Sequence, residues 1–258
     1  MSLTLSIDGR KVAAEAGRSL LDVARESGAE IPSLCHHPLI RSYGACRLCL
    51  VEVTRRGRTH VTTSCNYEVQ DGIEVATDTS LLRDHRRMVL AFLLGLAPDA
   101  RAVQGLARAY GVEEPLFAPR ELSPMREGCI LCGLCARVCG EVVGASALTL
   151  SGRGDRRALE APFAEPLSGS CIGCGACAAV CPTGAVEMES AAVARLRERW
   201  GEVRPCRYAL MGLSPGAVCP NDYLCATCEV DQRFVEACRP DHPVFAARGL
   251  ARPFGSEG

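Results

Sequence analysis

Apolar and polar residues alternate in short runs over the first 78 residues, and turn-forming residues separate the runs. Alternation with a period of two is typical of half-buried strands, whereas apolar residues three and four apart are typical of a helix. Ser19 precedes the run with helical spacing and Gly28 follows it, and both are residue types favoured at helix ends. The pattern predicts strands at 3–7 and 11–13 joined by Asp8-Gly9, a helix after Ser19, and strands at 49–54 and 72–76.

These patterns divide the chain into four parts and predict an α+β fold. Residues 1–78 predict a β-grasp domain, in which one helix packs on a small mixed sheet. Residues 79–120 predict a helical connector. Residues 121–190 contain the near-repeat CILCGLCARVC and CIGCGACAAVC, with a hairpin expected between the two copies. Residues 191–258 begin with a charged helix and continue into a small cysteine-rich segment that we expect to be irregular.

The connector carries the clearest helical pattern of the chain. Thr79 is a favourable N-cap, and Pro98 is expected to end the first helix. A second, short helix is predicted near 102–110, with Gly111 at its end. The apolar stripe of the first helix is predicted to consist of Leu82, Val89, Phe92, Leu93 and Leu96.

The composition is dominated by seventeen cysteines in 258 residues. Such a count indicates either a disulfide framework or metal ligation, and the redox compartment decides between them. The first residues show neither a basic region followed by a long apolar run nor a twin-arginine motif, so we expect the reducing cytoplasm, where thiolates stay available for metals. The best apolar stretch, 88–97, is too short to span a bilayer. A net charge of −1 gives no basic field for a nucleic acid.

The first cysteine group has the spacing C-x10-C-x2-C-x15-C and consists of Cys35, Cys46, Cys49 and Cys65. A [2Fe–2S] cluster takes four thiolates, two on each iron, and a C-x2-C pair on a loop commonly presents two of them. Gly44 and Ala45 stand just before this pair and let backbone N–H groups approach the sulfurs, which raises the potential of a cluster. A structural zinc site is the alternative, but the β-grasp pattern favours a ferredoxin-type [2Fe–2S] domain.

Two histidines, His36 and His37, follow Cys35 directly. A histidine can replace a thiolate, as in Rieske centres. Because four cysteines are already present, we expect both histidines to lie beside the cluster or at the surface instead of binding iron.

Two cysteine runs share the spacing C-x2-C-x2-C-x3-C, which is the run of bacterial two-cluster ferredoxins. In that arrangement the fourth cysteine of each run ligates the other cluster. By this rule one [4Fe–4S] cluster takes Cys129, Cys132, Cys135 and Cys181, and the second takes Cys171, Cys174, Cys177 and Cys139. Pro182 follows the second run as expected, whereas Gly140 follows the first. Zinc ribbons would need separated C-x2-C pairs in place of triplets.

The combination of motifs resembles a known family of electron-transfer subunits. The similarity lies in IPSLCHHPLIRSYGACRLCLVEV (31–53), TSCNYEVQDGIEV (63–75) and both cysteine runs. These segments are similar to the N-terminal region of the bacterial NADH dehydrogenase G chain, to the small diaphorase subunit of NAD-linked [NiFe] hydrogenases and to the N-terminal part of iron-only hydrogenases. The resemblance covers residues 1–190.

One departure from that family concerns the connector. The resemblance implies a further cluster there, bound by one histidine and three cysteines, and segment 86–112 is similar to that region. Ala97 stands near the expected histidine, however, and no cysteine lies between 66 and 128, so this cluster cannot form. His85, predicted near the apolar side of the helix, is expected to be structural. We hypothesise that the paired [4Fe–4S] clusters form the main electron path and that the [2Fe–2S] cluster is a separate entry or exit.

The last cysteine group has the spacing C-x12-C-x5-C-x2-C and consists of Cys206, Cys219, Cys225 and Cys228. Four cysteines that end in a C-x2-C pair suit tetrahedral zinc or another [4Fe–4S] cluster, and buried thiols without a metal are the third possibility. The iron–sulfur character of the rest of the chain favours a fourth cluster slightly. Cys238 is left over.

Three classes of function compete. A self-contained enzyme is disfavoured because neither a G-x-G-x-x-G motif opening a βαβ unit nor a P-loop occurs, and motifs for a hydrogenase centre have no room after residue 190. A zinc-rich nucleic-acid or scaffold module lacks a basic field. We therefore predict an iron–sulfur electron-transfer subunit of a multisubunit oxidoreductase. The resemblance implies a flavoprotein partner that oxidises NAD(P)H and a catalytic partner such as a hydrogenase or formate dehydrogenase, with an electron-bifurcating complex as the alternative.

Overall fold

The computed structural model describes residues 2–117, 128–161, 169–187, 190–200 and 203–247. The chain forms two compact units, and each is described by itself. The first unit joins Met1–His36 to Ser42–Cys132, and the second joins His37–Arg41 to Gly133–Gly258. Within the described ranges, no helix has both the length and the apolar composition needed to cross a membrane.

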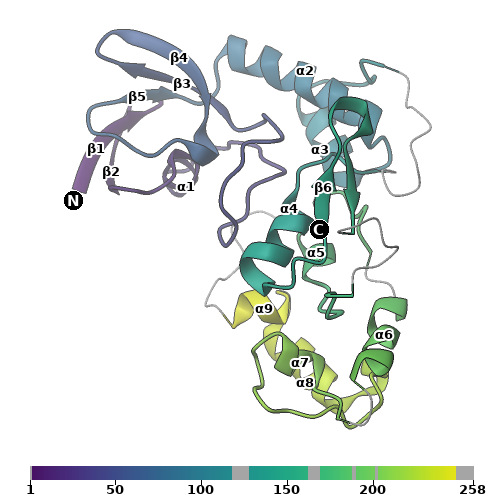
Figure 1. The fold of residues 1–258 in the computed structure, drawn as a ribbon. Coiled ribbons are helices and arrows are strands. Elements are labelled where there is room, and N and C mark those ends of the chain that lie inside the picture. Colours follow the sequence, from purple (N-terminus) through teal and green to yellow (C-terminus); the bar gives the residue numbers. More distant parts are fainter. Residues whose placement is uncertain (1, 118–127, 162–168, 188–189, 201–202, 248–258) are drawn as a thin grey trace. The chain divides into compact units, whose positions relative to one another are not determined.

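The first unit is built on a mixed sheet with the strand order β2-β1-β5-β3-β4 (Figure 1). Strands β1 and β5 run parallel, and the other neighbours are antiparallel. The elements of this unit are β1 (Ser2–Ile7), β2 (Arg10–Glu15), α1 (Leu20–Glu26), β3 (Leu50–Arg55), β4 (Arg58–Thr63), a 3-10 turn η1 (Ser64–Asn66), β5 (Glu74–Ala76), α2 (Ser80–Leu96) and α3 (Arg101–Ala109).

The predicted strands and the first helix are present, but β4 was not predicted. This strand lies at the edge of the sheet, and its residues 58–61 are exposed on both faces. An edge strand without a buried face carries no apolar alternation, and pairing with β3 is what defines it. Helix α1 begins as expected, because the side chain of Ser19 accepts a hydrogen bond from the Asp22 N–H at 3.2 Å.

The core of this unit packs one face of the sheet against α1. Four residues of α1 are buried there, namely Leu20, Leu21, Val23 and Ala24. Two cysteines of the first group, Cys49 and Cys65, belong to the same buried cluster. The sheet and helix therefore hold part of the candidate site inside the hydrophobic core.

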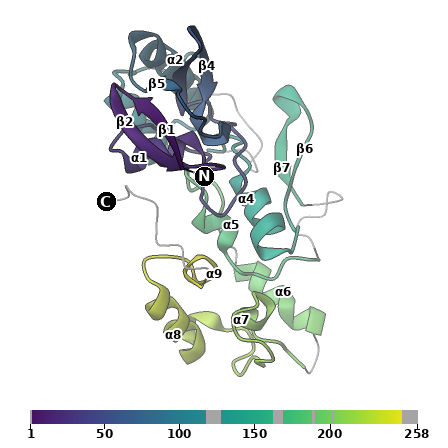
Figure 2. The same ribbon diagram turned by 90° about the vertical axis from the view of Figure 1, so that its left-hand side faces the viewer.

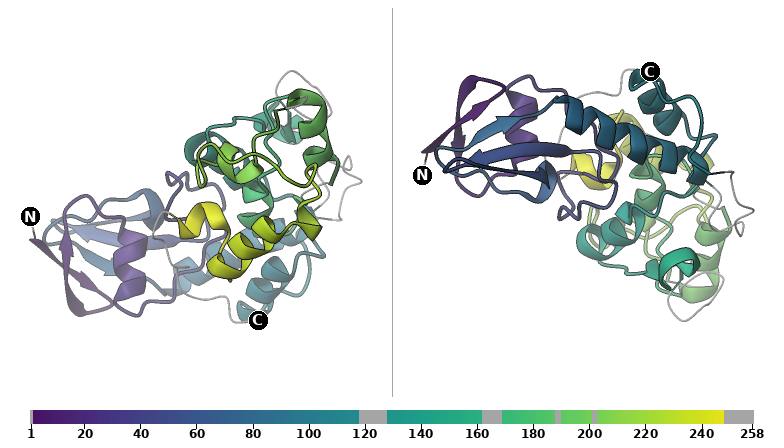
Figure 3. Two further views of the ribbon diagram at one scale, coloured as in Figure 1. Left: turned by 90° about the horizontal axis from the view of Figure 1, so that it is seen from below. Right: turned by 90° about the horizontal axis from the view of Figure 1, so that it is seen from above.

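Helix α2 follows the sheet, as the right-hand view of Figure 3 shows. The residues that it buries differ from the predicted apolar stripe. Phe92 is 44% exposed, whereas Arg86 is fully buried. His85, expected on the apolar side, is exposed, so that expectation is wrong. The prediction of the buried face used apolar residues only. It therefore included Phe92 and left out the charged Arg86, although Arg86 is buried.

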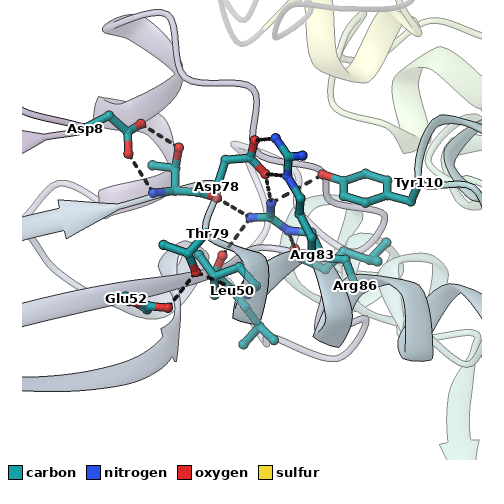
Figure 4. Close-up of polar contacts among 11 residues, drawn as sticks. Asp8, Leu50, Glu52, Asp78, Thr79, Arg83, Arg86 and Tyr110 are labelled. Carbon is teal, nitrogen blue, oxygen red and sulfur yellow. Dashed lines mark hydrogen bonds and ion pairs between the residues drawn. The ribbon is translucent and has the colours of Figure 1, made fainter.

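Arg86 is buried because the backbone around it supplies acceptors (Figure 4). Its guanidinium donates to Leu48 O at 3.1 Å, to Leu50 O at 2.8 Å and to Thr77 O at 2.9 Å. It also lies 3.7 Å from a carboxylate oxygen of Asp78. A buried cation with this many acceptors is satisfied, and it ties α2 to the ends of two strands.

Among its described residues, the second unit contains short helices and a β-hairpin, which Figure 2 shows as two adjacent strands. Its elements are α4 (Leu134–Arg137), a π-helical turn η3 (Val138–Val143), β6 (Thr149–Ser151), a 3-10 turn η4 (Gly154–Arg156), β7 (Ala158–Glu160), α5 (Ala176–Ala179), α6 (Ser190–Trp200), α7 (Arg207–Leu210), a 3-10 turn η6 (Cys225–Thr227), α8 (Glu229–Cys238) and α9 (Pro243–Ala246). The predicted hairpin and the predicted charged helix are present.

The C-terminal segment is more regular than the sequence indicated. Helices α8 and α9, drawn in yellow-green and yellow in Figure 3, contact each other. Helix α8 begins directly after Cys228 and carries Glu229 and Asp231 in its first turn, where negative charge suits the helix dipole. Its Phe234 stacks on Tyr208 of α7 with ring centroids 4.1 Å apart. The expectation of an irregular segment is therefore wrong for α8 and α9, whereas 211–224 form no helix or strand.

Replacing Arg86 by methionine tests the role of the buried guanidinium. The variant leaves three carbonyl oxygens without their donor, so we expect the free energy of unfolding to fall by about 3 kcal/mol or more. The shift is measured as a lower urea midpoint by circular dichroism. Arg87→Met is the matched control on the same helix, because Arg87 is 57% exposed and donates to a single carbonyl, that of Tyr110. Equal midpoints for the two variants would contradict the assignment.

Candidate iron–sulfur sites

The first cysteine group comes together as two pairs. The thiols of Cys35 and Cys46 hydrogen-bond to each other, and so do those of Cys49 and Cys65. These contacts lower the pKa of Cys46 to about 6 and that of Cys49 to about 7, while the pKa values of Cys35 and Cys65 rise because each thiol donates to its neighbour and is buried. A [2Fe–2S] cluster requires two cysteine sulfurs on each of its two irons. The two cysteine pairs therefore fit that group.

Backbone N–H groups point at the sulfurs of this group. The Leu34 N–H donates to the Cys46 sulfur at 3.4 Å, and the Cys46 N–H donates to the Cys35 sulfur at 3.3 Å. The loop reaches this conformation through Gly44, whose φ is +68°, and a Cβ there would lie 3.3 Å from the side chains of Thr63 and Asn66. The glycine before the C-x2-C pair thus permits a left-handed turn that packs closely on Thr63 and Asn66.

Two arginines hold the loops that carry these cysteines. Arg25 donates to Ile31 O at 2.7 Å and to the hydroxyl of Ser33 at 2.6 Å, just before Cys35. Burial lowers the pKa of Arg25, and its charge interacts with the sulfurs of Cys46, Cys49 and Cys65. Arg86 binds the carbonyls on either side of Cys49, those of Leu48 and Leu50.

His36 is engaged away from the cysteines. Its Nε2 lies 3.0 Å from the Asp22 carboxylate and its Nδ1 lies 3.2 Å from the Ser42 hydroxyl. The hydrogen bond with His36 holds the pKa of Asp22 below its usual value. With both ring nitrogens in these contacts, His36 ties α1 to the cysteine loop. The ring of His37 lies 4.8 Å from that of Phe245.

The two cysteine runs share a backbone conformation. The second residue after the first cysteine has a positive φ in both, +54° at Leu131 and +60° at Gly173. In the first run this turns the Leu131 N–H toward the Cys129 sulfur at 3.4 Å. A leucine in this region is strained by about 1–2 kcal/mol, which the glycine of the second run avoids. A short helix, α4 or α5, then begins after the second cysteine of each run.

Cys139, the last cysteine of the first run, lies among the cysteines of the second. Its charge interacts with Cys171, Cys174 and Cys177. Burial raises the pKa of Cys139, and the Ala147 N–H donates to its sulfur at 3.2 Å. Burial also raises the pKa of Cys177 to about 11. The Cys181 sulfur lies 3.6 Å from the Thr183 hydroxyl.

The C-terminal cysteines line one pocket. All four predicted residues, Cys206, Cys219, Cys225 and Cys228, belong to its wall, together with Arg207 and Asp231 of a buried ion pair. The leftover Cys238 lies at the end of α8 and is not part of that wall. No disulfide joins any of the cysteines, all of which lie in the described ranges.

Two domain families match the chain, and together they define an iron–sulfur protein. A 2Fe-2S iron–sulfur cluster binding domain matches residues 1–80, and a 4Fe-4S dicluster domain matches residues 128–185. The N-terminal ferredoxin-type domain and the paired-cluster domain predicted from the cysteine spacing are thereby confirmed.

Several curated proteins are similar to part of this chain. The mitochondrial NADH-ubiquinone oxidoreductase 78 kDa subunit of Neurospora crassa is 32% identical over 58% of this chain and 23% of its own length. The NADPH-Fe(3+) oxidoreductase subunit alpha of Geobacter sulfurreducens is 32% identical over 64% of this chain and 22% of its own length. The matches reach only 20–30% of the length of the curated relatives.

A solved structure is also similar to the structure of this chain. A chain in the crystal structure of an NAD+-reducing [NiFe]-hydrogenase in the H2-reduced state is 32% identical, with a TM-score of 0.55, and the match covers 63% of this chain and 76% of that one. The chain belongs to the iron–sulfur protein family that includes this hydrogenase chain and the NADH-quinone oxidoreductase G subunits. The resemblance inferred from residues 31–53, 63–75 and the cysteine runs is therefore confirmed.

Arg25 and Arg86 are the residues of the site that sequence reasoning missed. Arg86 could have been noticed, because it stands four residues from both Leu82 and Leu90, which are buried on the same face. Arg25 gave no such pattern. Its role depends on a loop that passes the end of α1, and only the folded chain brings the two together.

Removing the charge of Arg25 should lower the midpoint potential of the [2Fe–2S] centre. A positive charge stabilises the reduced, more negative state, so Arg25→Gln shifts the potential downward by on the order of 50 mV, or about 1 kcal/mol for one electron. The measurement is a redox titration followed by electron paramagnetic resonance (EPR). Arg55→Gln, at the exposed end of β3, is the control with the same charge change and should leave the potential unaltered. An upward shift, or equal shifts in both variants, would argue against the electrostatic role.

Proposed function

We propose that this chain is an iron–sulfur electron-transfer subunit that relays electrons between a flavin-containing, NAD(P)H-oxidising subunit and a catalytic subunit such as a hydrogenase or formate dehydrogenase. The observation that carries the proposal is the position of Cys139 among Cys171, Cys174 and Cys177, together with the two cysteine pairs of the first group. The names of two relatives join a nicotinamide cofactor to a second redox partner, namely ubiquinone or Fe(3+). A cytoplasmic, reducing location suits the many thiols.

The proposed ligands follow the cysteine groups. The [2Fe–2S] cluster would be held by Cys35, Cys46, Cys49 and Cys65. One [4Fe–4S] cluster would be held by Cys129, Cys132, Cys135 and Cys181, and the other by Cys171, Cys174, Cys177 and Cys139. The C-terminal cysteines Cys206, Cys219, Cys225 and Cys228 would bind a further metal centre, iron–sulfur or zinc. The four parts 1–78, 79–120, 121–190 and 191–258 are the domains we propose.

The side chains described above support a relay and show what each contributes. When bound, the clusters accept and release single electrons. Backbone N–H groups at Cys35, Cys46 and Cys139 place positive ends of dipoles at the sulfurs, which favours the reduced state. Arg25 adds a full charge beside the first group. The burial of these sulfurs keeps water from them and protects the centres from hydrolysis.

The sequence of the connector bears on the path that electrons take through the chain. No cysteine lies between 66 and 128, so the relay that relatives are expected to carry there cannot form. We propose that electrons pass mainly along the paired centres and that the [2Fe–2S] centre is a branch. Reduction of every centre at the same rate by one partner would count against the branch.

The crossed ligation makes a sharp prediction. Cys139→Ala and Cys174→Ala should remove the same EPR signal and lower the iron content equally, by about four atoms per chain. Cys135→Ala should remove the other signal instead. The samples are compared after dithionite reduction and iron analysis. A Cys139→Ala spectrum that matches that of Cys135→Ala would show uncrossed runs.

Purification of the tagged chain from its native cells tests the relay function. We expect a flavin-containing subunit and a catalytic oxidoreductase subunit to co-purify, and NAD(P)H to reduce iron–sulfur signals within the complex. The same sample without NAD(P)H is the control. A chain that is stable and alone in the cell would contradict the subunit role, and a colourless chain with zinc and no reducible signals would establish a scaffold. Coupled reduction of a low-potential ferredoxin would establish the bifurcating alternative.

A further inference from the structure

The pocket lined by the C-terminal cysteines belongs to no domain family that matches the chain, since those matches end at residue 185. We propose that it binds a [4Fe–4S] cluster, not zinc, and that this cluster exchanges electrons with the centre held by Cys171, Cys174 and Cys177. This inference rests on the proposed relay function and extends the electron path into the C-terminal segment.

Two short backbone pairings bring the first two ligands side by side. The Cys206 N–H donates to Ala217 O at 2.7 Å, and the Cys219 N–H donates to Arg204 O at 2.6 Å. The other two ligands are set by η6 and the start of α8, where the Cys228 N–H donates to Cys225 O at 3.1 Å. These local pairings set the sulfurs two by two, and the Arg207–Asp231 ion pair joins the two halves of the pocket wall.

The loop after Cys219 has a strained backbone that directs an N–H group at the Cys219 sulfur. Asp222 and Tyr223 both have positive φ angles, +48° and +58°. Adjacent non-glycine residues in this region cost about 1–3 kcal/mol each and persist only where the surroundings impose them. Here the Tyr223 hydroxyl donates to Pro205 O at 2.9 Å, and Arg197 and Arg204 pair with the Asp222 carboxylate. The result is a Tyr223 N–H that donates to the Cys219 sulfur at 3.1 Å.

One residue of the pocket wall carries a buried donor that has no partner among the described residues. The Nε–H of Arg207 makes no hydrogen bond to any described residue, although Arg207 lines the pocket. The guanidinium is held in place by Asp231, whose carboxylate lies 2.8 Å from Nη2 and accepts from the Tyr208 hydroxyl at 2.9 Å. An unsatisfied buried N–H is unfavourable unless an acceptor fills the space beside it. The sulfide and thiolate sulfurs of a cluster are such acceptors.

The surroundings of the pocket favour a cluster over a single zinc ion. Four cysteines that end in a C-x2-C pair can bind either group. The pocket wall contacts the second cysteine run, which lies in the matching 4Fe-4S dicluster domain. A redox centre beside that run extends an electron path, whereas zinc has no redox chemistry.

Contacts with the second cysteine run place the pocket beside a neighbouring centre. Arg207, which lines the pocket, has Nη1 3.5 Å from the carbonyl of Gly173, between Cys171 and Cys174. His242 Nε2 lies 2.8 Å from Cys174 O. One residue thus touches both sites, and the short path suits electron tunnelling. In each transfer one electron leaves the reduced centre and enters the oxidised one, with no atom or proton exchanged.

The test compares the full-length chain, isolated without oxygen, with a Cys225→Ala, Cys228→Ala double variant. We expect the double variant to lose about four iron atoms per chain and one EPR signal, with no zinc in either sample. The signal of the neighbouring centre should become narrower, because its spin partner is gone. Cys238→Ser is the control, since Cys238 is outside the pocket wall, and it should keep all iron.

The outcomes separate this inference from the relay function. One zinc atom per chain that is lost in the double variant, with iron unchanged, would overturn the inference and leave the relay intact. Unchanged iron and zinc would also overturn it. Mössbauer spectra of the unaltered chain need no variant, and the ratio of iron in [4Fe–4S] to iron in [2Fe–2S] sites should be about six to one and not about four to one. Absence of iron from the unaltered chain would refute the relay function itself.

Discussion

Four buried cysteine sulfurs come together in the first group of this chain, and like charges repel one another strongly where the dielectric constant is low. The structure counters this repulsion with dipoles and full charges aimed at the sulfurs. Backbone N–H groups reach Cys46 and Cys139, and the guanidinium of Arg25 lies beside the first group. Positive φ angles at Leu131 and Tyr223 are the conformational strain through which such N–H groups are turned inward.

The same requirement explains why arginines are buried in a chain of nearly neutral net charge. Arg86 holds the carbonyls on either side of Cys49 and fixes α2 against the sheet. Helix α2 contains no cysteine, but it supports the loop around Cys49 through the side chain of Arg86. Arg207 has the corresponding position beside the C-terminal pocket, where its partner Asp231 keeps it in place.

Local conformation and long-range packing contribute differently at the three groups. Local turns direct N–H groups at single sulfurs in the first run and in the C-terminal group, as at Leu131 and Tyr223. Long-range packing brings Cys139 of the first run to the cysteines of the second. The first group depends on the sheet instead, since Cys49 precedes β3 and Cys65 follows β4. Pairing of β3 with β4 is what brings those two sulfurs together. Loss of sheet register would therefore affect the first group most.

The sequence by itself determined the cysteine groups, the family, the main strands and the helix boundaries at Ser19 and Thr79, because these depend on spacing along the chain and on local hydrogen bonds. Only the tertiary structure decided the edge strand β4, the exposure of His85 and the burial of Arg86, because each depends on neighbours that are distant in sequence. The helices after Cys228 were hidden from pattern analysis for the same reason: packing of Phe234 on Tyr208, more than periodicity, holds α8 in place.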